Sequence, residues 1–460
     1  MKKVKIGFLP LYIELYDDFS KHLRPGVEAF CNSVKSALEK EGADLVAADI
    51  CRIRSEFETA IREFEAADVD AIVSLHLAYS PSLESAEVIA GTRLPLIVLD
   101  TTRDYCFDFN VATGSTSYNH GIHGVQDFCN LMKRLGKDYS IFAGHYLNSD
   151  VVKRVVDAAR AVKATRAFSG MKVGRIGGSF EGMGDFCVSS ETAKRLGVSV
   201  IDCDGDRLVE LRDTITDKDV RSEYDADCKD HGCTIPYENY AEPQRTSLAV
   251  RKWIREEKLS AFTMNFRMAG KMKGLDTVPF AEACKEMAQG VGYAGEGDAI
   301  NAALVGALMS AFDEVNFVEM FCPDWKNDTV YFNHMGECNA NLMENRFMIT
   351  KKFAFSDIAD PTYMLGQMKA GRGCVLNMLP NAEGWFDVVI VEGEMMQLPE
   401  KIENFPITIN GWFKPNVTVS KLLERYSEAG GTHHSSFVYG ADASSLVLFA
   451  KSMGMKYTVI

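Results

Sequence analysis

The sequence predicts an α/β protein in which two parallel-sheet domains of the Rossmann or flavodoxin type precede a mainly antiparallel, barrel-like C-terminal domain. Three observations lead to this prediction. Short apolar runs alternate with helical stretches before residue 313, as in βαβ units. Those runs are nearly continuously apolar, which is typical of strands buried on both faces of a sheet. After residue 313, β-type runs separated by turn signals dominate.

The first α/β domain is predicted to span residues 1–170. Its predicted strands are Val4–Leu9, Leu45–Ala48, Ala71–Leu75 and Pro95–Leu99. The helices between them are Val27–Glu41, Phe57–Ala66 and Leu83–Ala90. Because each strand is followed by a helix, we expect the strands to be parallel.

The second α/β domain is predicted over residues 171–312. Its predicted strands are Lys172–Ile176, Val198–Ile201 and Ala261–Phe266, and its helices are Ser189–Leu196, Ser247–Glu257 and Phe280–Gln289. The polar segment Asp213–Pro243 is expected to hold helix and loop. The glycine-rich loop Gly177–Gly184 lacks the G-x-G-x-x-G spacing of dinucleotide sites, which disfavours a nucleotide.

The β-rich domain is predicted over residues 313–460, and its last helix is predicted at Val419–Glu428, ending at two glycines. The predicted strands are Val318–Phe321, Thr329–Phe332, Phe347–Thr350, Gly373–Met378, Phe386–Glu394 and Ile407–Gly411.

The net charge restricts the classes of partner that the protein can bind, and the cysteine pattern indicates its redox compartment. The 460 residues carry 50 basic and 64 acidic side chains, a net charge of −14, which argues against nucleic acid or an anionic membrane as partner. The 12 cysteines are scattered without metal-site or redox spacing and indicate reduced thiols in the cytoplasm. We find neither a signal peptide nor a run of about 20 apolar residues for a membrane span.

The segment Gly292–Asp298 holds the first candidate for chemistry. It places Glu296 between two glycines, and a helix-forming run, Ala299–Met309, follows at once. A carboxylate on a glycine-flanked strand-to-helix turn is well placed to reach into a cleft. The structural alternative is a helix-start residue favoured by the helix dipole.

Further donors occur in unusual settings downstream. Glu319 lies in an apolar β-type run, His334 follows another, and His433 and His434 lie between glycines and serines. Two carboxylates with one or two imidazoles suit Mn²⁺, Co²⁺ or Mg²⁺ and lack the thiolates of structural zinc sites. The alternatives are an outward strand residue for Glu319, a hydrogen-bonded core histidine for His334 and a helix cap for the histidine pair.

The chain resembles the L-arabinose isomerase family. Gly292–Asp298 is similar to the family's metal-binding glutamate segment, and His334-Met335-x-Glu337-Cys338 to its H-M-L-E-V-C run. Ala429–His434 is close to A-G-G-x-H-H. The resemblance implies a metal-dependent aldose–ketose isomerase of ene-diol mechanism acting on a pentose or hexose, with Mn²⁺ favoured. It implies metal ligands at Glu296, Glu319, His334 and His434, with the two glutamates also catalytic.

The resemblance also implies substrate contacts and assembly. Leu75–Pro81 looks like the family's L-H-T-F-S-P, and Asn119–Gly124 like N-Q-x-A-H-G. The implied substrate-binding residues are His433, Met183, Phe266, Tyr79, His120 and His123. A homo-oligomer is implied, with a hexamer favoured, and active sites at subunit interfaces where Tyr79 and His123 serve a neighbour's metal.

Departures from the family pattern concern the sugar-facing residues. Ile13–Tyr16 stands where the family has S-Q-H-L-Y, His120 replaces a glutamine and Tyr79 a phenylalanine. These changes bring L-arabinose itself into question and leave two alternatives. One is an isomerase for a modified sugar, deoxy or charged; the other is a non-catalytic sugar-binding protein. His120 and His123 also form a possible metal pair of their own.

Overall fold

The computed structural model describes residues 2–399 and 411–460, which divide into two compact units. Unit 1 comprises Met1–Lys163 and Ser444–Gly454, and unit 2 comprises Ala164–Ala443 and Met455–Ile460. The domain boundaries at residues 170 and 312 remain predictions.

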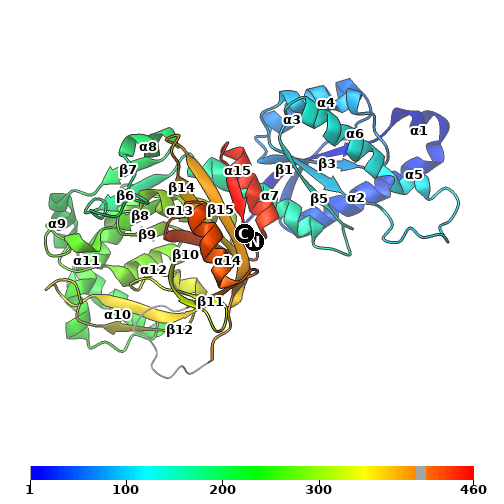
Figure 1. Cartoon of the computed structure of the whole chain (residues 1–460). Coiled ribbons are helices and arrows are strands. Elements are labelled where there is room, and N and C mark those ends of the chain that lie inside the picture. Colours follow the sequence, from blue (N-terminus) through cyan, green and yellow to red (C-terminus); the bar gives the residue numbers. More distant parts are fainter. Residues whose placement is uncertain (1, 400–410) are drawn as a thin grey trace. The chain divides into compact units, whose positions relative to one another are not determined.

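Unit 1 is built on a parallel sheet in the order β2-β1-β3-β4-β5, confirming the predicted fold class (Figure 1). Its strands are β1 (Val4–Leu11), β2 (Ala43–Ala47), β3 (Ala71–His76), β4 (Leu96–Asp100) and β5 (Tyr139–Ala143). Every residue of β3 is buried. Val73 and Leu75 join the hydrophobic cluster on one face, and Ile72 joins the cluster on the other. The β3 sequence is therefore apolar almost throughout because both faces of the sheet are covered.

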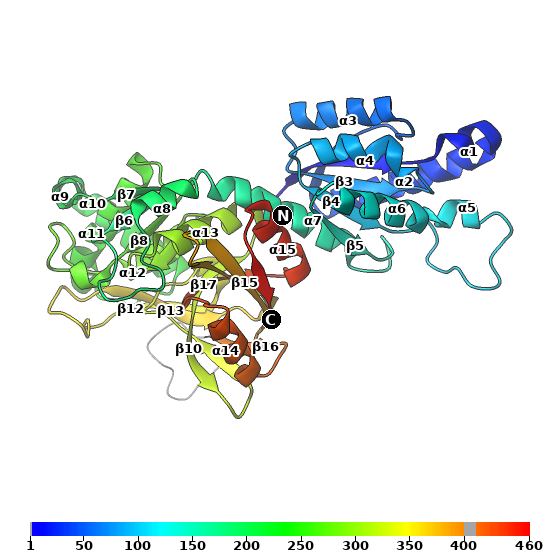
Figure 2. The same ribbon diagram turned by 45° about the horizontal axis from the view of Figure 1, so that its top comes forward.

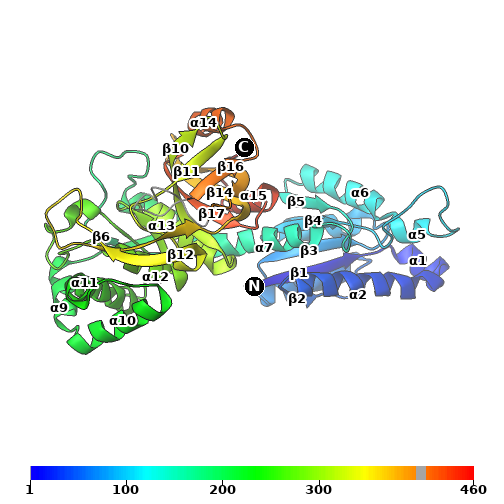
Figure 3. The same cartoon turned by 90° about the horizontal axis from the view of Figure 1, so that it is seen from below.

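Helices cover both faces of this sheet (Figures 2 and 3). One face packs on α2 (Arg24–Lys40), α7 (Val151–Phe168) and α15 (Ala443–Ser452). The other packs on α3 (Arg54–Ala66), α4 (Ser82–Gly91) and α6 (Gly121–Arg134). The short helices α1 (Glu14–Phe19) and α5 (Thr116–Asn119) complete the unit. Among the described residues, no helix has the length and apolar character needed to cross a membrane.

Unit 2 begins with a second parallel sheet, in the order β7-β6-β8-β9. Its strands are β6 (Lys172–Ile176), β7 (Ser199–Asp202), β8 (Ala261–Met264) and β9 (Gly292–Gly295). Its helices are α8 (Ser190–Arg195), α9 (Gly205–Asp213), α10 (Asp217–Asp230), α11 (Tyr237–Glu256), α12 (Phe280–Ala288) and α13 (Ala299–Ala311).

Helix α11 starts earlier than the predicted helix Ser247–Glu257, so that prediction was wrong at its N-terminal end. Pro243 signals a helix break because it lacks the N–H of the helical ladder. In the structure Pro243 is buried inside α11 beside the fully buried Tyr240. Tertiary packing therefore outweighs the local preference.

The rest of unit 2 is a closed antiparallel barrel, as predicted. Its strands follow the order β14-β17-β10-β11-β16-β15, and β15 pairs with β14 to close it. They are β10 (Val315–Asp324), β11 (Thr329–Phe332), β14 (Gly371–Pro380), β15 (Phe386–Met395), β16 (Gly411–Pro415) and β17 (His434–Tyr439). A separate ribbon pairs β12 (Met343–Thr350) with β13 (Thr362–Met368), and β18 (Tyr457–Val459) joins β15 in parallel.

The last predicted strand and the last predicted helix of the C-terminal domain differ in how they compare with the structure. The predicted strand Ile407–Gly411 lies outside the described residues except for Gly411, where β16 starts. Helix α14 (Val419–Glu428) matches its prediction but is not the last helix, because α15 follows. The α15 sequence is a short apolar run, in which periodicity does not distinguish a buried helix from a strand.

Helix α13 contacts both the parallel sheet and the barrel strands β10, β14 and β17 (Figure 1). It is buried all along Ala299–Met309, as expected of a helix that is apolar all round. Its approach to β9 depends on two glycines: a Cβ on Gly292 would lie 2.4 Å from the Gly306 nitrogen and 2.4 Å from the Ala302 carbonyl oxygen. This contact fixes the position of the turn that joins β9 to α13.

We expect Gly292→Ala to destabilise unit 2 by about 1–3 kcal/mol, because the added methyl group forces α13 away from β9. Gly170→Ala is the control, since its Cβ would meet only the Ala167 carbonyl oxygen at 3.8 Å. Urea unfolding followed by tryptophan fluorescence measures both. Equal midpoints for the two variants would contradict this account of the β9–α13 contact.

Candidate metal centre

Glu296 occupies a strained turn between β9 and α13. Its φ is 63° and that of Gly297 is 87°, so two successive residues take left-handed backbone conformations. A side chain on Gly297 is excluded, because its Cβ would lie 2.3 Å from the Gly178 carbonyl oxygen. The Thr263 hydroxyl accepts from the Gly297 N–H at 3.0 Å and holds the turn against β8. Strain of this kind persists only where the surroundings enforce it, and it is common at functional sites.

Three adjacent barrel strands bring the other donors to this turn. In the antiparallel ladder of β10 and β17, Glu319 is the direct partner of His434. On the other side of β10, β11 pairs Phe332 with Met320, and the Asn333 N–H donates to the Glu319 carbonyl oxygen at 3.2 Å. His334, the next residue, therefore lies beside Glu319.

The side-chain atoms of these residues converge. The described residues form two groups of metal-type donors whose ligand atoms lie within 4.8 Å of one another: Glu296, His433 and His434, and Glu319, His334 and His434. Oε2 of Glu296 is 3.7 Å from Nε2 of His434, and Oε2 of Glu319 is 3.9 Å from Nε2 of His334. Ligands of one ion at bond lengths of about 2.1 Å lie at most about 4.2 Å apart, so both pairs fit a shared ion.

The surroundings of His434 fix its ring and leave its Nε2 without a hydrogen-bond partner among the described residues. Its side chain is fully buried, its Nδ1 lies 3.1 Å from Oδ2 of Asp298, and its ring stacks on Phe186 at 5.0 Å between centroids. Its buried Nε2 has no hydrogen-bond partner among the described residues. An orphaned buried nitrogen is costly unless something binds it. Burial lowers the pKa of His434 far below its usual range, which leaves the imidazole neutral, the form that binds metals.

His334 is oriented in the same manner by a different carboxylate. Its Nδ1 lies 2.6 Å from Oε2 of Glu337, and the Tyr293 hydroxyl donates to the other oxygen of Glu337 at 2.7 Å. Burial opposes the charged form of His334, but Glu337, Glu319 and Glu296 outweigh it and raise its pKa to about 9. A carboxylate on Nδ1 directs Nε2 at the ion in many metal centres.

His433 forms the edge of the group. Its Nδ1 lies 2.6 Å from Oδ2 of Asp185, and its Nε2 lies 3.6 Å from Oε2 of Glu296. Burial works against its charge, yet hydrogen bonds with Glu296 and Asp185 raise its pKa to about 9. Unlike His434, the His433 side chain is 30% exposed. It is therefore the member of the histidine pair that an incoming molecule can reach.

The two glutamates differ in their electrostatic settings. Burial favours the neutral form of Glu296, but the hydrogen bond with His433 and the nearby histidines lower its pKa overall. Burial raises the pKa of Glu319, and His334 only partly opposes this. Burial likewise raises the pKa of Asp298 to about 7. Glu296 and Glu319, each in a donor group that contains His434, thus differ in proton affinity.

The remaining predicted substrate residues divide between the units. Met183 lies in the loop between β6 and α8, and Phe266, in a turn after β8, packs on Phe180 at 5.6 Å between ring centroids. Tyr79, His120 and His123 belong to unit 1.

The unit 1 residues have local partners there. Tyr79 donates to Asp127 at 3.3 Å, and Nε2 of His120 lies 3.1 Å from the Tyr16 hydroxyl. Neither metal-type donor group of the described residues includes His120 or His123.

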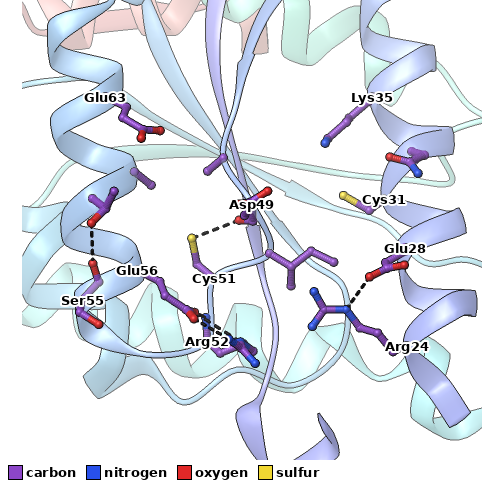
Figure 4. Close-up of a pocket in the computed structure, with 15 residues that line it drawn as sticks. Arg24, Glu28, Cys31, Lys35, Asp49, Cys51, Arg52, Ser55, Glu56 and Glu63 are labelled. Carbon is purple, nitrogen blue, oxygen red and sulfur yellow. Dashed lines mark hydrogen bonds and ion pairs between the residues drawn. The ribbon is translucent and has the colours of Figure 1, made fainter. Parts of the chain in front are cut away.

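A cavity of about 700 Å³ lies in unit 1 between α2 and α3 (Figure 4). Two of its three cationic side chains form ion pairs: Arg24 with Glu28 at 2.9 Å and Arg52 with Glu56 at 2.6 Å. The cavity is a polar hollow with mixed charge and gathers no catalytic set.

Sequence reasoning gave no role to the residues that orient the histidines. Glu337 follows His334 by three residues and Asp298 follows Glu296 by two, so proximity in the chain was an available signal for both. Asp185 and Phe186 lie about 250 residues before the histidines they contact, and nothing in the local sequence marks them.

Two family models match consecutive parts of the chain. Residues 188–313 match the model of the L-arabinose isomerase central domain, and residues 314–456 match that of the L-arabinose isomerase C-terminal domain. Together the matches cover more than half of the chain, and the matched residues include Glu296, Glu319, His334 and His434.

Curated relatives extend the similarity toward the N-terminus. The L-arabinose isomerase of Oceanobacillus iheyensis is 24% identical over 459 residues, 94% of each chain. That of Shouchella clausii is 25% identical over 359 residues, covering 74% of this chain and 71% of the relative. That of Nocardioides sp. is 25% identical over 402 residues, covering 83% and 78%.

We expect Asp298→Asn to weaken Mn²⁺ binding by about 10–100-fold, because it removes the carboxylate that orients His434. Asp204→Asn is a matched control: Asp204 caps α9 as Asp298 caps α13, through a side-chain oxygen that accepts a backbone N–H. Isothermal titration of the metal-free protein with Mn²⁺ measures both. Unchanged affinity in Asp298→Asn would show that Asp298 acts only as a helix cap.

Proposed function

The chain belongs to the L-arabinose isomerase family, and we propose that it is a metal-dependent isomerase that interconverts an aldose and the corresponding ketose. The observation that carries the proposal is a pair of close donor groups that share His434: Glu296 with His433 and His434, and Glu319 with His334 and His434. A set of two carboxylates and two imidazoles, each imidazole with its Nδ1 on a carboxylate, suits binding of a divalent cation.

The metal proposed is Mn²⁺, with Co²⁺ and Mg²⁺ as the alternatives, held by Glu296, Glu319, His334 and His434. The donor chemistry fits, because oxygen and imidazole nitrogen ligands suit ions of this hardness. The orphaned Nε2 of His434 supports the same assignment. A divalent ion in this position supplies Lewis-acid stabilisation of negative charge on the substrate oxygens.

The two glutamates carry the proton transfers in this proposal. One carboxylate takes the proton from C2 of the aldose and returns it to C1. The other moves a proton from the O2 hydroxyl to O1, so that the aldehyde becomes a primary alcohol and C2 becomes a ketone. Both steps need a carboxylate within hydrogen-bond reach of the substrate. Glu296, on its strained turn, and Glu319, on β10, are proposed for these roles because each belongs to a donor group that contains His434.

The substrate is proposed as a pentose or hexose. The isomerase of a modified sugar stays the second candidate because of the substitutions at His120, Tyr79 and Ile13–Tyr16. The packed aromatic rings of Phe180, Phe266 and Phe355 near the Glu296 turn also present an apolar surface to a ligand.

We expect Glu296→Gln and Glu319→Gln each to lower turnover by at least about 10²-fold, because each removes a proton-transferring group. Ketose formation is measured with Mn²⁺ across pentoses, hexoses, deoxy sugars and uronates. Glu181→Gln is the control, an exposed carboxylate near the site. Full activity in either variant, or after exhaustive EDTA treatment, would refute the mechanism. Binding of sugar without turnover or metal dependence would instead favour a sugar-binding protein.

We further propose a cytoplasmic homo-oligomer, with a hexamer favoured, whose active sites are completed by a neighbour's Tyr79 and His123. The twelve cysteines are scattered along the sequence without metal-site or redox spacing, which supports a reducing compartment. If each active site is shared between two subunits, two different inactive variants complement each other in a mixed oligomer. One intact site can then form from the undamaged residues of the two chains.

Co-expressed His123→Ala and Glu296→Gln chains, carrying different tags, are therefore expected to regain a clear fraction of wild-type activity. Each variant alone is expected to be nearly inactive. Sequential affinity purification isolates the mixed oligomer, and sedimentation velocity gives its size. A fully active monomer, or a mixed oligomer no more active than its parents, would contradict the shared site.

A further inference from the structure

Neighbouring histidines of the candidate centre are each held by a carboxylate, but the two carboxylates come from different parts of unit 2. Asp298, at the start of α13, holds His434. Asp185, in the loop between β6 and α8, holds His433. We propose that Asp185 is a positioning residue that directs Nε2 of His433 toward Glu296, so that an Asp185–His433 pair takes part in the isomerase site. The part that concerns turnover rests on the proposed function.

The geometry of the pair restricts the His433 ring strongly. A single oxygen of Asp185, Oδ2, lies 2.6 Å from Nδ1 and also accepts the backbone N–H of His433 at 3.1 Å. Holding the backbone and the ring through one oxygen fixes the side-chain rotamer. With Nδ1 committed to Asp185, Nε2 is the nitrogen that faces Glu296, at 3.6 Å. The same carboxylate thus sets the direction of the ring and, when the imidazole is neutral, its tautomer.

The loop that carries Asp185 is itself anchored to the Glu296 turn. The Phe180 N–H donates to the Glu296 carbonyl oxygen at 2.9 Å. The Ser179 hydroxyl donates to the Gly297 carbonyl oxygen at 3.4 Å. Asn265 donates to the Ser179 carbonyl oxygen at 3.1 Å. Asp185 is therefore positioned relative to the carboxylate that its histidine faces.

Exposure separates the roles of the two histidines. Phe186, next to Asp185, stacks on His434 with an interplanar angle of 16°, and that ring is fully buried. The side chains of His433 and Asp185 are 30% and 38% exposed. A purely structural ion pair at this exposure contributes little to stability. The pair instead holds an accessible nitrogen beside a buried carboxylate, where it meets a substrate hydroxyl.

The direct test uses the metal-free protein labelled with ¹⁵N-histidine. Long-range ¹H–¹⁵N spectra are recorded at a pH above the His433 pKa of about 9, where the ring is neutral, and His433 is assigned by His433→Gln. They are expected to show the ring proton on Nδ1 in the wild type. In Asp185→Ala we expect the ring signals to move to the averaged position of a freely exchanging imidazole. Glu181→Ala, which removes a carboxylate from the same loop, is expected to leave them unchanged. Unchanged His433 signals in Asp185→Ala would overturn the pairing.

Kinetics test the consequence for turnover. On any aldose that the wild type isomerises, Asp185→Ala is expected to lower kcat by about 10–100-fold. We expect its Mn²⁺ affinity to stay within twofold, because His434, His334, Glu296 and Glu319 are untouched. Asp185→Asn is expected to recover part of kcat, since an amide oxygen accepts the same two hydrogen bonds. Unchanged kcat, or equal losses in metal affinity and kcat, would overturn the positioning role.

The two proposals fail in distinguishable ways. Absence of isomerase activity in the wild type would reject the proposed function and leave the spectra to decide the pairing. An active wild type with an unperturbed Asp185→Ala variant would reject only the role of Asp185.

Discussion

The antiparallel register between β10 and β17 is the constraint on which the candidate centre depends. It sets Glu319 opposite His434, and the pairing of β11 on the other side of β10 brings His334 to the same place. A slip of one residue would turn these side chains to the opposite face of the sheet. Closure of the barrel through β14 and β15 leaves no free edge along which the ladder can shift. Backbone hydrogen bonds, more than contacts among the donors, thus fix three of the four side chains.

A second set of groups prepares the donors before any ligand arrives. Asp298, Glu337 and Asp185 each take the Nδ1 side of one histidine, and Tyr293 supports Glu337. The Nε2 atoms therefore face the glutamates without reorganisation. Glu296 alone depends on backbone strain, since its left-handed φ is imposed by Gly297, Thr263 and the close packing of β9 on α13. Such preorganisation lowers the cost of binding, because the ordering is completed during folding.

Much of this organisation follows from local patterns in the chain. The parallel strands were predicted because they are apolar throughout, and the turn at Gly292–Asp298 because glycines flank a carboxylate before a helix. Helix α15 was missed because a short apolar run has no distinctive period, and α11 was shortened by Pro243. The contacts of Asp185 and Phe186 escaped prediction for a deeper reason. They join residues about 250 positions apart, and only the folded chain brings them together.

Unit 1 is assembled from two pieces of the chain, Met1–Lys163 and Ser444–Gly454. Leu448 of the second piece packs into the same hydrophobic cluster as α2 and α7. During synthesis the sheet and its first helices emerge well before α15, because the segment Ala164–Ala443 lies between them in the chain. The apolar surface that α15 covers is therefore exposed to solvent while nearly all of unit 2 is translated. Exposed apolar surface favours aggregation during this period. Unit 1 is thus complete only after Ser444–Gly454 has been made, and a chain cut after residue 163 lacks part of the core of this unit.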